Sequence, residues 1–252
     1  MARLLLAIEC ASRRASAALA REGEGVVAVR EADPALPHAA SLLPAVDALL
    51  AGTGVHLDDL DAFAVAVGPG AFTSLRIGIA TVKGLAFAAP GVAPVVAPVS
   101  TLGAIALETF EGASTEASVD ERPVAAVLDA RRGEVYAGVF ERPLPPAGTA
   151  DRLAPASPGE RVEAVAALAR ALPPRARLAG EPPRALLDAL RDAGRDDVEL
   201  APPPARPRAA AVAALGRAQL ASGRVVEAAA LAPRYLRRPE AEEKRLRAER
   251  AG

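Results

Sequence analysis

The stretch "VAVGPGAFTSLRIGIATVKGLAFA" at residues 65–88 changes character part-way along its length. It starts as an apolar run typical of a buried strand and breaks at Gly-Pro-Gly in 68–70. It then continues as a long apolar segment whose charges are Arg76 and Lys83. A glycine turn between a strand and a helix can direct backbone N–H groups at an anion. The stretch is therefore either a phosphate-binding loop or a tight turn that leads into a contact helix.

Neither of the common nucleotide-binding loops fits this turn. A Walker loop needs Gly-Lys followed by Ser or Thr, and no such run follows. The dinucleotide fingerprint needs a third glycine at the position of Thr73. We therefore favour a structural turn made by Gly68, Pro69 and Gly70, with Thr73 as the N-cap of a helix over 73–89.

The predicted helix over 73–89 is apolar in nearly every direction. Arg76 and Lys83 are seven residues apart and share one narrow stripe. A helix that is apolar almost all round is buried on more than one side. Gly78 and Gly84 each cost helix propensity, roughly 1 kcal/mol relative to alanine, and they fit a helix that another helix approaches closely. The burial can come from this chain's own second layer or from a partner.

The order of the other elements predicts an α/β fold. Three short apolar runs are followed by alternating helices and strands. The expected strands of the first part lie at 3–9, 15–20, 26–30, 62–67 and 92–97, with a helix at 38–51. Another helix follows the last of these strands, with Ser100 or Thr101 as its N-cap. Strands joined through helices pair in parallel, whereas tight turns join antiparallel strands. The result is a mixed sheet flanked by helices.

A second unit follows the first along the chain. Its expected elements are strands at 124–130 and 134–141, a helix at 162–172, a strand at 176–180, a helix at 183–193, a strand near 198–201 and a last helix at 209–221. The two early strands flank the turn of "LDARRGEVY", which carries Asp129 and Glu134. These carboxylates are suitable for acid–base work, but in a hairpin turn they are more typical of turn and ion-pair chemistry.

Composition excludes several classes of function. A formal net charge of −1 and an isoelectric point of about 6.2 disfavour a large nucleic-acid-binding surface. With Cys10 as the single cysteine, no internal disulfide or cysteine zinc site can form, and His38 and His56 are too far apart to share a helix turn as metal ligands. Prolines interrupt the longest uncharged segment, and the N-terminal apolar run is too short for a signal peptide. We expect a metal-free cytoplasmic chain without a membrane contact.

The first strand ends at Glu9, where actin-like and sugar-kinase-like ATPases place an aspartate before a Gly/Thr-rich phosphate turn. Here the turn reads "ECASRRAS" and contains no glycine. A close backbone approach to phosphate is therefore lost, and at most a weak nucleotide contact at Glu9 and Arg13 remains. Cys10 has no evident general base, because neither histidine can be placed beside it from sequence.

Six segments together resemble the bacterial TsaB (YeaZ) family in order and spacing: "LLLAIECASRRASAAL", "HAASLLPAVDALL", "VAVGPGAFTSLRIGIATVKGLA", "PVVAPVSTLGAIA", "LDARRGEVYAGVF" and "APRYLRRPEAE". The resemblance covers 1–140 well and 143–230 only in outline. Two positions depart from the family pattern, with Glu9 in place of an aspartate and Ser74 where glycine is common.

The resemblance implies an actin-like (ASKHA) fold of two lobes, at 1–105 and 106–208, with a C-terminal helix and charged tail at 209–252 and the helix packed back on the first lobe. It also implies a role in making threonylcarbamoyladenosine (t6A) in tRNA beside the anticodon.

Members of this family do not carry the catalytic site themselves. They pair with a TsaD-like catalytic paralogue, are joined by a TsaE-like ATPase, and meet tRNA indirectly through the complex. From the residues alone we also expect a homodimer when the chain is without its partner, because an exposed apolar helix face tends to self-pair. No cofactor is implied. TsaD-like proteins bind their metal through two histidines four apart, whereas here His38 is followed four residues later by Leu42.

The partner-binding face implied by this resemblance consists of the helices at 38–51 and 73–89. Its expected residues are His38, Leu42, Leu43, Val46, Leu49, Leu50, Arg76, Ile79, Val82 and Lys83. On this hypothesis, Leu42→Asp or Ile79→Asp blocks the heterodimer and leaves the monomer folded. The alternative is a stand-alone ASKHA-type ATPase or kinase, which would bind ATP near Glu9, Arg13 and 68–70.

Overall fold

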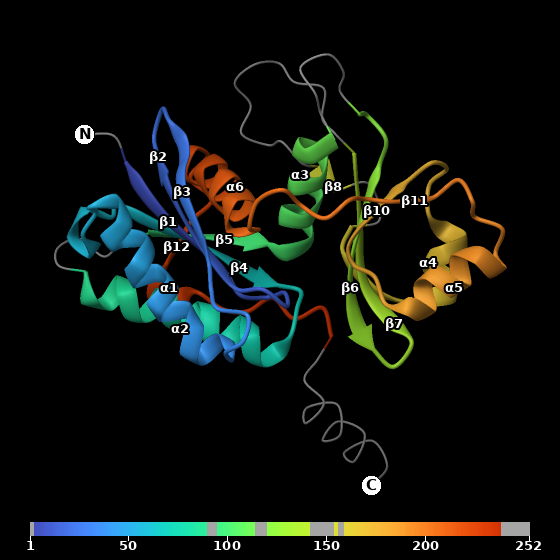
Figure 1. Ribbon diagram of the computed structural model, residues 1–252, viewed down its shortest axis with the longest axis horizontal. Helices are drawn as coiled ribbons and strands as arrows, with labels where there is room; N and C mark the ends of the chain where they lie inside the picture. The colour runs from blue at the N-terminus through green and yellow to red at the C-terminus, as the bar shows by residue number, and fades with distance from the viewer. Residues whose placement is uncertain (1–2, 90–94, 114–119, 142–153, 156–158, 238–252) are drawn as a thin grey trace, which may run out of the picture.

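Two mixed β-sheets, one in each half of the chain, organise the molecule (Figure 1). The computed structural model describes residues 3–89, 95–113, 120–141, 154–155 and 159–237. The first half contains β1 Leu4–Glu9, β2 Ser16–Arg21, β3 Gly25–Glu31, α1 His38–Thr53, β4 Ala62–Gly68, α2 Phe72–Ala88, β5 Val95–Ser100 and α3 Thr101–Ala113. The second half contains β6 Val124–Arg131, β7 Glu134–Glu141, β8 Ala154–Pro155, β9 Arg161–Ala164, α4 Val165–Ala171, β10 Arg177–Glu181, α5 Arg184–Asp192 and β11 Glu199–Leu200.

The C-terminal part of the chain returns to the first sheet. It contains α6 Ala209–Ala221, β12 Val226–Glu227 and a short 3₁₀ turn at Ala228–Ala230. Within the described residues the first sheet has the order β12-β5-β4-β1-β2-β3. β1, β4 and β5 are parallel, whereas β1, β2 and β3 form an antiparallel meander and β12 pairs antiparallel with β5. Every residue of β4 is buried, as expected of a central strand covered on both faces.

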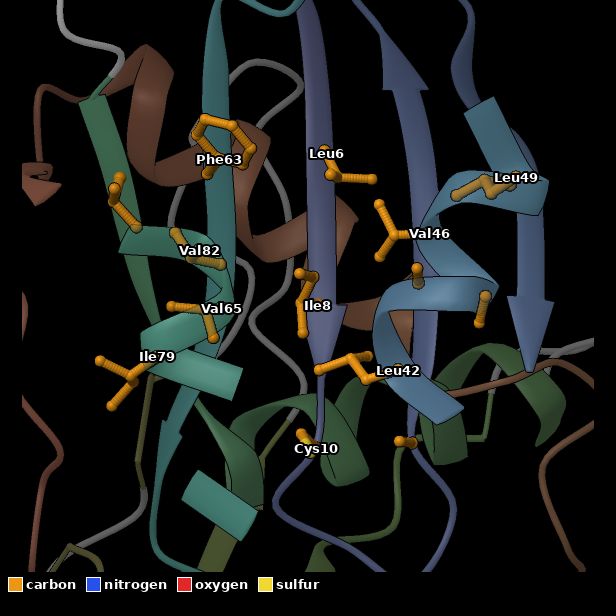
Figure 2. Packing of buried hydrophobic residues seen from close by; sticks show 14 of the residues in the cluster. Leu6, Ile8, Cys10, Leu42, Val46, Leu49, Phe63, Val65, Ile79 and Val82 are labelled. Atoms are coloured by element: carbon orange, nitrogen blue, oxygen red, sulfur yellow. The ribbon is translucent and has the colours of Figure 1, made fainter. Parts of the chain in front are cut away.

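Alternating side chains of β1 enter two different cores. Leu6 and Ile8 pack in the core under α1 and α2, which Figure 2 shows in close view, whereas Leu5 and Ala7 pack in the core on the opposite face, with α6 and part of α3. This is the two-residue period of an extended strand. Gly216 of α6 faces Ala64 of β4, and the missing side chain lets α6 lie close against the sheet.

The second sheet is layered in the same way. Within the described residues it has the order β11-β10-β6-β7-β8, and β9 also pairs with β7. One face packs against α4 and α5, and the other packs against α3. Helix α3 serves both halves of the molecule, since Ala104 and Leu107 belong to a core of the first sheet while Leu102 and Ile105 belong to the core of the second. The two lobes are therefore joined through a shared helix.

Most element positions agree with the sequence-based expectations to within three residues, with two corrections. The expected helix at 162–172 is wrong at its start, because residues 161–164 form β9 against β7 and α4 begins at Val165. Thr73 is not an N-cap, because α2 begins at Phe72 and Ala71 precedes it without a side-chain cap. The Ser100 alternative is confirmed for α3, since Ser100 Oγ accepts the Gly103 N–H at 3.1 Å. The start of the strand expected at 92–97 and the tail from 238 on lie outside the described residues.

Candidate functional site

The turn between β1 and β2 is filled by one of its own side chains. Glu9 is fully buried, and its Oε1 accepts the N–H groups of Ala11 at 2.7 Å and Ser12 at 3.0 Å. Its Oε2 accepts the Ser12 hydroxyl at 2.7 Å. These bonds offset the cost of burying the carboxylate. The Ala11 and Ser12 donors are thus already used, and a phosphate entering here would also meet the negative charge of Glu9.

The Gly-Pro-Gly turn that follows β4 is closed by two other segments of the chain. A Cβ on Gly68, which has φ +127°, would lie 2.5 Å from Arg234 O, and a Cβ on Gly70 would lie 2.7 Å from Ala11 O. The Arg234 N–H also donates to Val67 O at 2.7 Å. The glycines are required because backbone lies directly against them. The geometry therefore favours the structural reading of this turn over a phosphate-binding loop.

The structure places His38 beside Cys10, a contact that sequence reasoning missed. His38 Nε2 lies 3.1 Å from Arg13 O, and because a carbonyl only accepts, Nε2 carries the hydrogen. His38 Nδ1 then accepts the Cys10 thiol, with Sγ at 3.4 Å. Burial, together with the neighbouring Glu9 charge, raises the pKa of Cys10 to about 12, so the thiol stays protonated. The pair ties the start of α1 to the β1–β2 turn and does not make a nucleophile.

Half of the residues expected on a partner-binding face lie instead in the chain's own core (Figure 2). Each is at most 6% exposed, and they are Leu42, Val46, Leu49, Ile79 and Val82. The reason is that both helices cover the first sheet and present these positions to it. Their assignment to an exposed face is corrected, and so is the expectation that Leu42→Asp or Ile79→Asp leaves the monomer folded.

The outer surfaces of α1 and α2 are nevertheless apolar. Leu43 is 53% exposed and Phe87 is 93% exposed. Half-buried apolar side chains lie beside them and pack against the core from outside, among them Leu50, Ile77 and Leu85. We call the outward surface made by Leu43, Leu50, Ile77, Ala80, Gly84, Leu85 and Phe87 the α1–α2 outer face.

The two glycines of α2 serve different purposes. A Cβ on Gly78 would lie 3.1 Å from Cys10 Cβ, so this glycine permits close packing on the end of β1 and not on a second helix. A Cβ on Gly84 would meet no atom within 4 Å. With the exposed Ala80 one turn earlier, Gly84 leaves a shallow strip along the α1–α2 outer face where another helix has room to approach.

Arg76 and Lys83 are engaged by the C-terminal segment of the same chain, residues 228–237, which we call the strap. Lys83 Nζ donates to Ala229 O at 3.1 Å. Arg76 Nε donates to Tyr235 Oη at 3.2 Å, and the Arg76 guanidinium lies 4.0 Å from the centre of the Phe72 ring. The Phe72 and Tyr235 rings stack with centroids 5.2 Å apart. The charged stripe of α2 thus binds the strap.

The remaining candidate residues form ion pairs across and within the lobes. The Arg13 N–H donates to Glu181 Oε1 at 3.1 Å, and the Arg13 side chain itself is 86% exposed. Asp129 accepts the Arg131 N–H at 2.7 Å and pairs with its guanidinium. Glu134 pairs with Arg237 of the strap. Asp129 and Glu134 therefore have the turn and ion-pair roles that the sequence favoured over acid–base chemistry.

Neither a metal-binding cluster nor a membrane-spanning helix is found in the parts of the chain that the structure describes. No three His, Cys, Asp or Glu side chains among these residues gather in a way that could hold a metal ion. None of the helices found there has the length and apolar character needed to cross a bilayer.

Comparison with known proteins identifies the family. A family model described as TsaD, tRNA N6-adenosine threonylcarbamoyltransferase, matches residues 15–181. A solved structure titled YeaZ from Pseudomonas aeruginosa matches with a TM-score of 0.69 and 30% identity, covering 93% of this chain and 100% of that one. The chain belongs to the TsaB (YeaZ) family. The two mixed sheets and their helices accordingly form the two-lobed, actin-like α/β fold.

Curated relatives agree with this membership. Proteins named tRNA threonylcarbamoyladenosine biosynthesis protein TsaB match from Haemophilus influenzae, at 38% identity over 132 residues, and from Escherichia coli, at 38% over 138 residues. These matches cover 52% and 55% of this chain. They cover 51% and 55% of the two TsaB proteins, so the chain spans about half the length of these relatives. An uncharacterized protein of Mycobacterium tuberculosis is 32% identical over 240 residues, which is 94% of this chain and 93% of that one.

Proposed function

We propose that this chain is the non-catalytic scaffold and activator subunit of the tRNA t6A modification machinery, and that it pairs with a TsaD-like catalytic paralogue. A TsaE-like ATPase joins the pair, tRNA is contacted through the complex, and the chain forms a homodimer when alone. The observation that carries the proposal is the Glu9 carboxylate, which occupies the phosphate turn of an actin-like fold in a member of the TsaB family.

The chemistry available to the described residues supports a non-catalytic role. In the β1–β2 turn the Ala11 and Ser12 N–H groups are bound by Glu9 and the Arg13 N–H by Glu181, and the Gly-Pro-Gly turn is closed by backbone from Ala11 and Arg234. The thiol of Cys10 is held protonated by burial. Nucleophilic chemistry at Cys10 would need an ionised thiol, and nucleotide binding at these two turns would need free N–H donors. The stand-alone ATPase or kinase reading therefore receives no support from the geometry.

The α1–α2 outer face supports a role in pairing. An apolar surface on two adjacent helices, with a strip of small residues between larger ones, fits two helices of a partner in a four-helix arrangement. A TsaD-like partner suits this face because the family model that matches this chain is that of TsaD, which implies a related lobe with equivalent helices. The homodimer that we propose would use the same face, because two copies of this face can pack against each other around a two-fold axis.

Reconstitution of tRNA threonylcarbamoylation tests the proposal. TsaC-like, TsaD-like and TsaE-like proteins from the same genome are combined with ATP, threonine, bicarbonate and tRNA, with and without this chain. We expect modification to require the chain and to be lost with Leu43→Asp or Phe87→Asp. Leu200→Asp is the matched control, since Leu200 is exposed on the edge of the second sheet. Equal modification without the chain would refute the proposed function, and full activity of both outer-face variants would refute the proposed interface.

A further inference from the structure

The strap makes contacts with both lobes within four residues. Leu231 is buried in the core beneath α1 and α2, which fixes the strap's beginning on the first lobe. Further along, the Arg234 N–H donates to Val67 O, and Tyr235 stacks on Phe72 and accepts from Arg76. These contacts attach the strap to the end of β4 and to the first turn of α2.

The two arginines on either side of Tyr235 bind the second lobe. Arg234 Nη1 lies 2.8 Å from Glu160 Oε2, and Glu160, just before β9, has a side chain that is only 6% exposed. Arg237 Nη1 donates to Ala130 O at 2.7 Å, and its guanidinium also pairs with Glu134 across the β6–β7 turn. Along this short segment, Tyr235 contacts the first lobe, and the arginines before and after it, Arg234 and Arg237, form ion pairs with the second lobe.

The buried carboxylate of Glu160 depends on this arrangement. It accepts the hydroxyl of Ser100, at the end of β5, and pairs with Arg234. Burial raises the pKa of Glu160, while these two partners counteract the increase. A buried carboxylate is strongly unfavourable when its cationic partner is removed. Glu160 thus connects the second lobe to two separate segments of the first.

The strap and α3 connect the two lobes at different places (Figure 1). Helix α3 packs into the cores of both sheets, as a hinge would. The strap passes below it, between the first turn of α2 and the β6–β7 turn. Without the strap, α3 and the Arg13–Glu181 contact would still join the lobes, and an attachment away from α3 limits rotation of the lobes about that helix.

We propose that the strap is a latch that fixes the two lobes in one arrangement and couples the β6–β7 turn of the second lobe to the first turn of α2. Arg234 and Arg237 provide the attachment to the second lobe, and Tyr235 provides the attachment to α2. Because the strap is one covalent segment, release at either end loosens the contacts at the other, and this coupling is reciprocal. The latch is a property of the chain by itself and does not depend on the proposed function.

The distance between a spin label on each lobe, measured by double electron–electron resonance, tests the latch. Spin labels at Asp58→Cys in the first lobe and Asp192→Cys in the second, both exposed positions, are introduced in a Cys10→Ala background. We expect one narrow distance distribution with the native strap, and a broader distribution in both Arg237→Ala and Tyr235→Ala. Arg21→Ala is the matched control, because its ion pair with Glu24 lies within the first lobe, and it is expected to leave the distribution narrow.

Hydrogen exchange on the same variants reports the coupling. Arg237→Ala is expected to speed exchange of the Arg234 amide and of amides in the first turn of α2, and Tyr235→Ala to speed exchange in the β6–β7 turn. A narrow distance distribution in both variants, with a faster Arg234 amide, would show that the strap is released without consequence and would overturn the latch. Unchanged exchange of that amide in both variants would also overturn it, because the named contacts would then not hold the strap.

Discussion

The β1–β2 turn and the α1–α2 outer face lie on the same lobe and differ in whether their interactions are completed within the chain. In the turn, two N–H donors and a hydroxyl are bound to the Glu9 carboxylate, and His38 binds both Cys10 and Arg13 O. On the outer face, Leu43 and Phe87 are exposed to solvent. Polar groups that a ligand would need are satisfied internally, whereas apolar area that a partner helix would cover is open. The difference fits the proposal that this lobe pairs with another protein.

The largest expected effect separates the inner and outer sides of the same two helices. Leu42→Asp and Ile79→Asp place a charge in a core without a partner, so each is expected to lower the free energy of unfolding by more than about 4 kcal/mol. Leu43→Asp and Phe87→Asp are expected to change it by no more than about 0.5 kcal/mol. Denaturant unfolding followed by circular dichroism measures all four. If Leu42→Asp and Leu43→Asp lowered the free energy of unfolding equally, the assignment of Leu42 to the core side and Leu43 to the outer side of α1 would be wrong.

Sequence reasoning predicted the element order well, because strand and helix periodicities and glycine turns are local signals. It could not divide the two sides of α1, because Leu42 and Leu43 are adjacent, chemically identical and on a helix that is apolar beyond a minimal stripe. Gly78 and Gly84 were likewise indistinguishable, although one faces Cys10 and the other faces open space. Only the placement of the sheet decides these cases.

Contacts between distant segments were also beyond the sequence. Cys10 and His38 are separated by 28 residues, and Arg76 and Tyr235 by 159. A strand end and a helix start carry no mark that they will meet, and a charged stripe on a helix looks the same whether a partner or the chain's own C-terminal segment covers it. This is why Arg76 and Lys83 were predicted on the partner-binding face and bind the strap instead.

A second prediction compares a glycine in a closed turn with a glycine on the open face. Gly70→Ala adds a methyl group within 3 Å of Ala11 backbone and side-chain atoms, and it is expected to cost about 1–3 kcal/mol of unfolding free energy. Gly84→Ala meets no atom, and it is expected to stabilise the helix by up to about 1 kcal/mol. Chemical denaturation gives both values. A stabilising Gly70→Ala would show that the turn is not closed by Ala11.

The third prediction concerns the protonated thiol in the closed turn. The pKa of Cys10 is raised from 9.0 to about 12 by folding, so above pH 9 the unfolded chain loses a proton that the folded chain retains. The contribution of Cys10 to stability is therefore full below pH 9 and falls as pH rises toward 12, by at most about 1.4 kcal/mol per pH unit. The difference between the native chain and Cys10→Ala in unfolding free energy, measured across this range, isolates the effect from other titrating groups. A difference that does not vary with pH would contradict it.

The smallest expected effect is a null result that bears directly on the comparison between the two regions. Isothermal titration of the chain with Mg-ATP to high micromolar concentration is expected to give no binding heat, because Glu9 occupies the Ala11 and Ser12 N–H donors and Ala11 covers Gly70. Removing the negative charge alone by Glu9→Gln is expected to leave the titration flat, since the amide oxygen still accepts those N–H groups and the Gly-Pro-Gly turn stays closed. Saturable heat with the native chain would mean that the closed turn opens for a ligand. The contrast between a completed polar turn and an open apolar face would then no longer assign this lobe to protein binding alone.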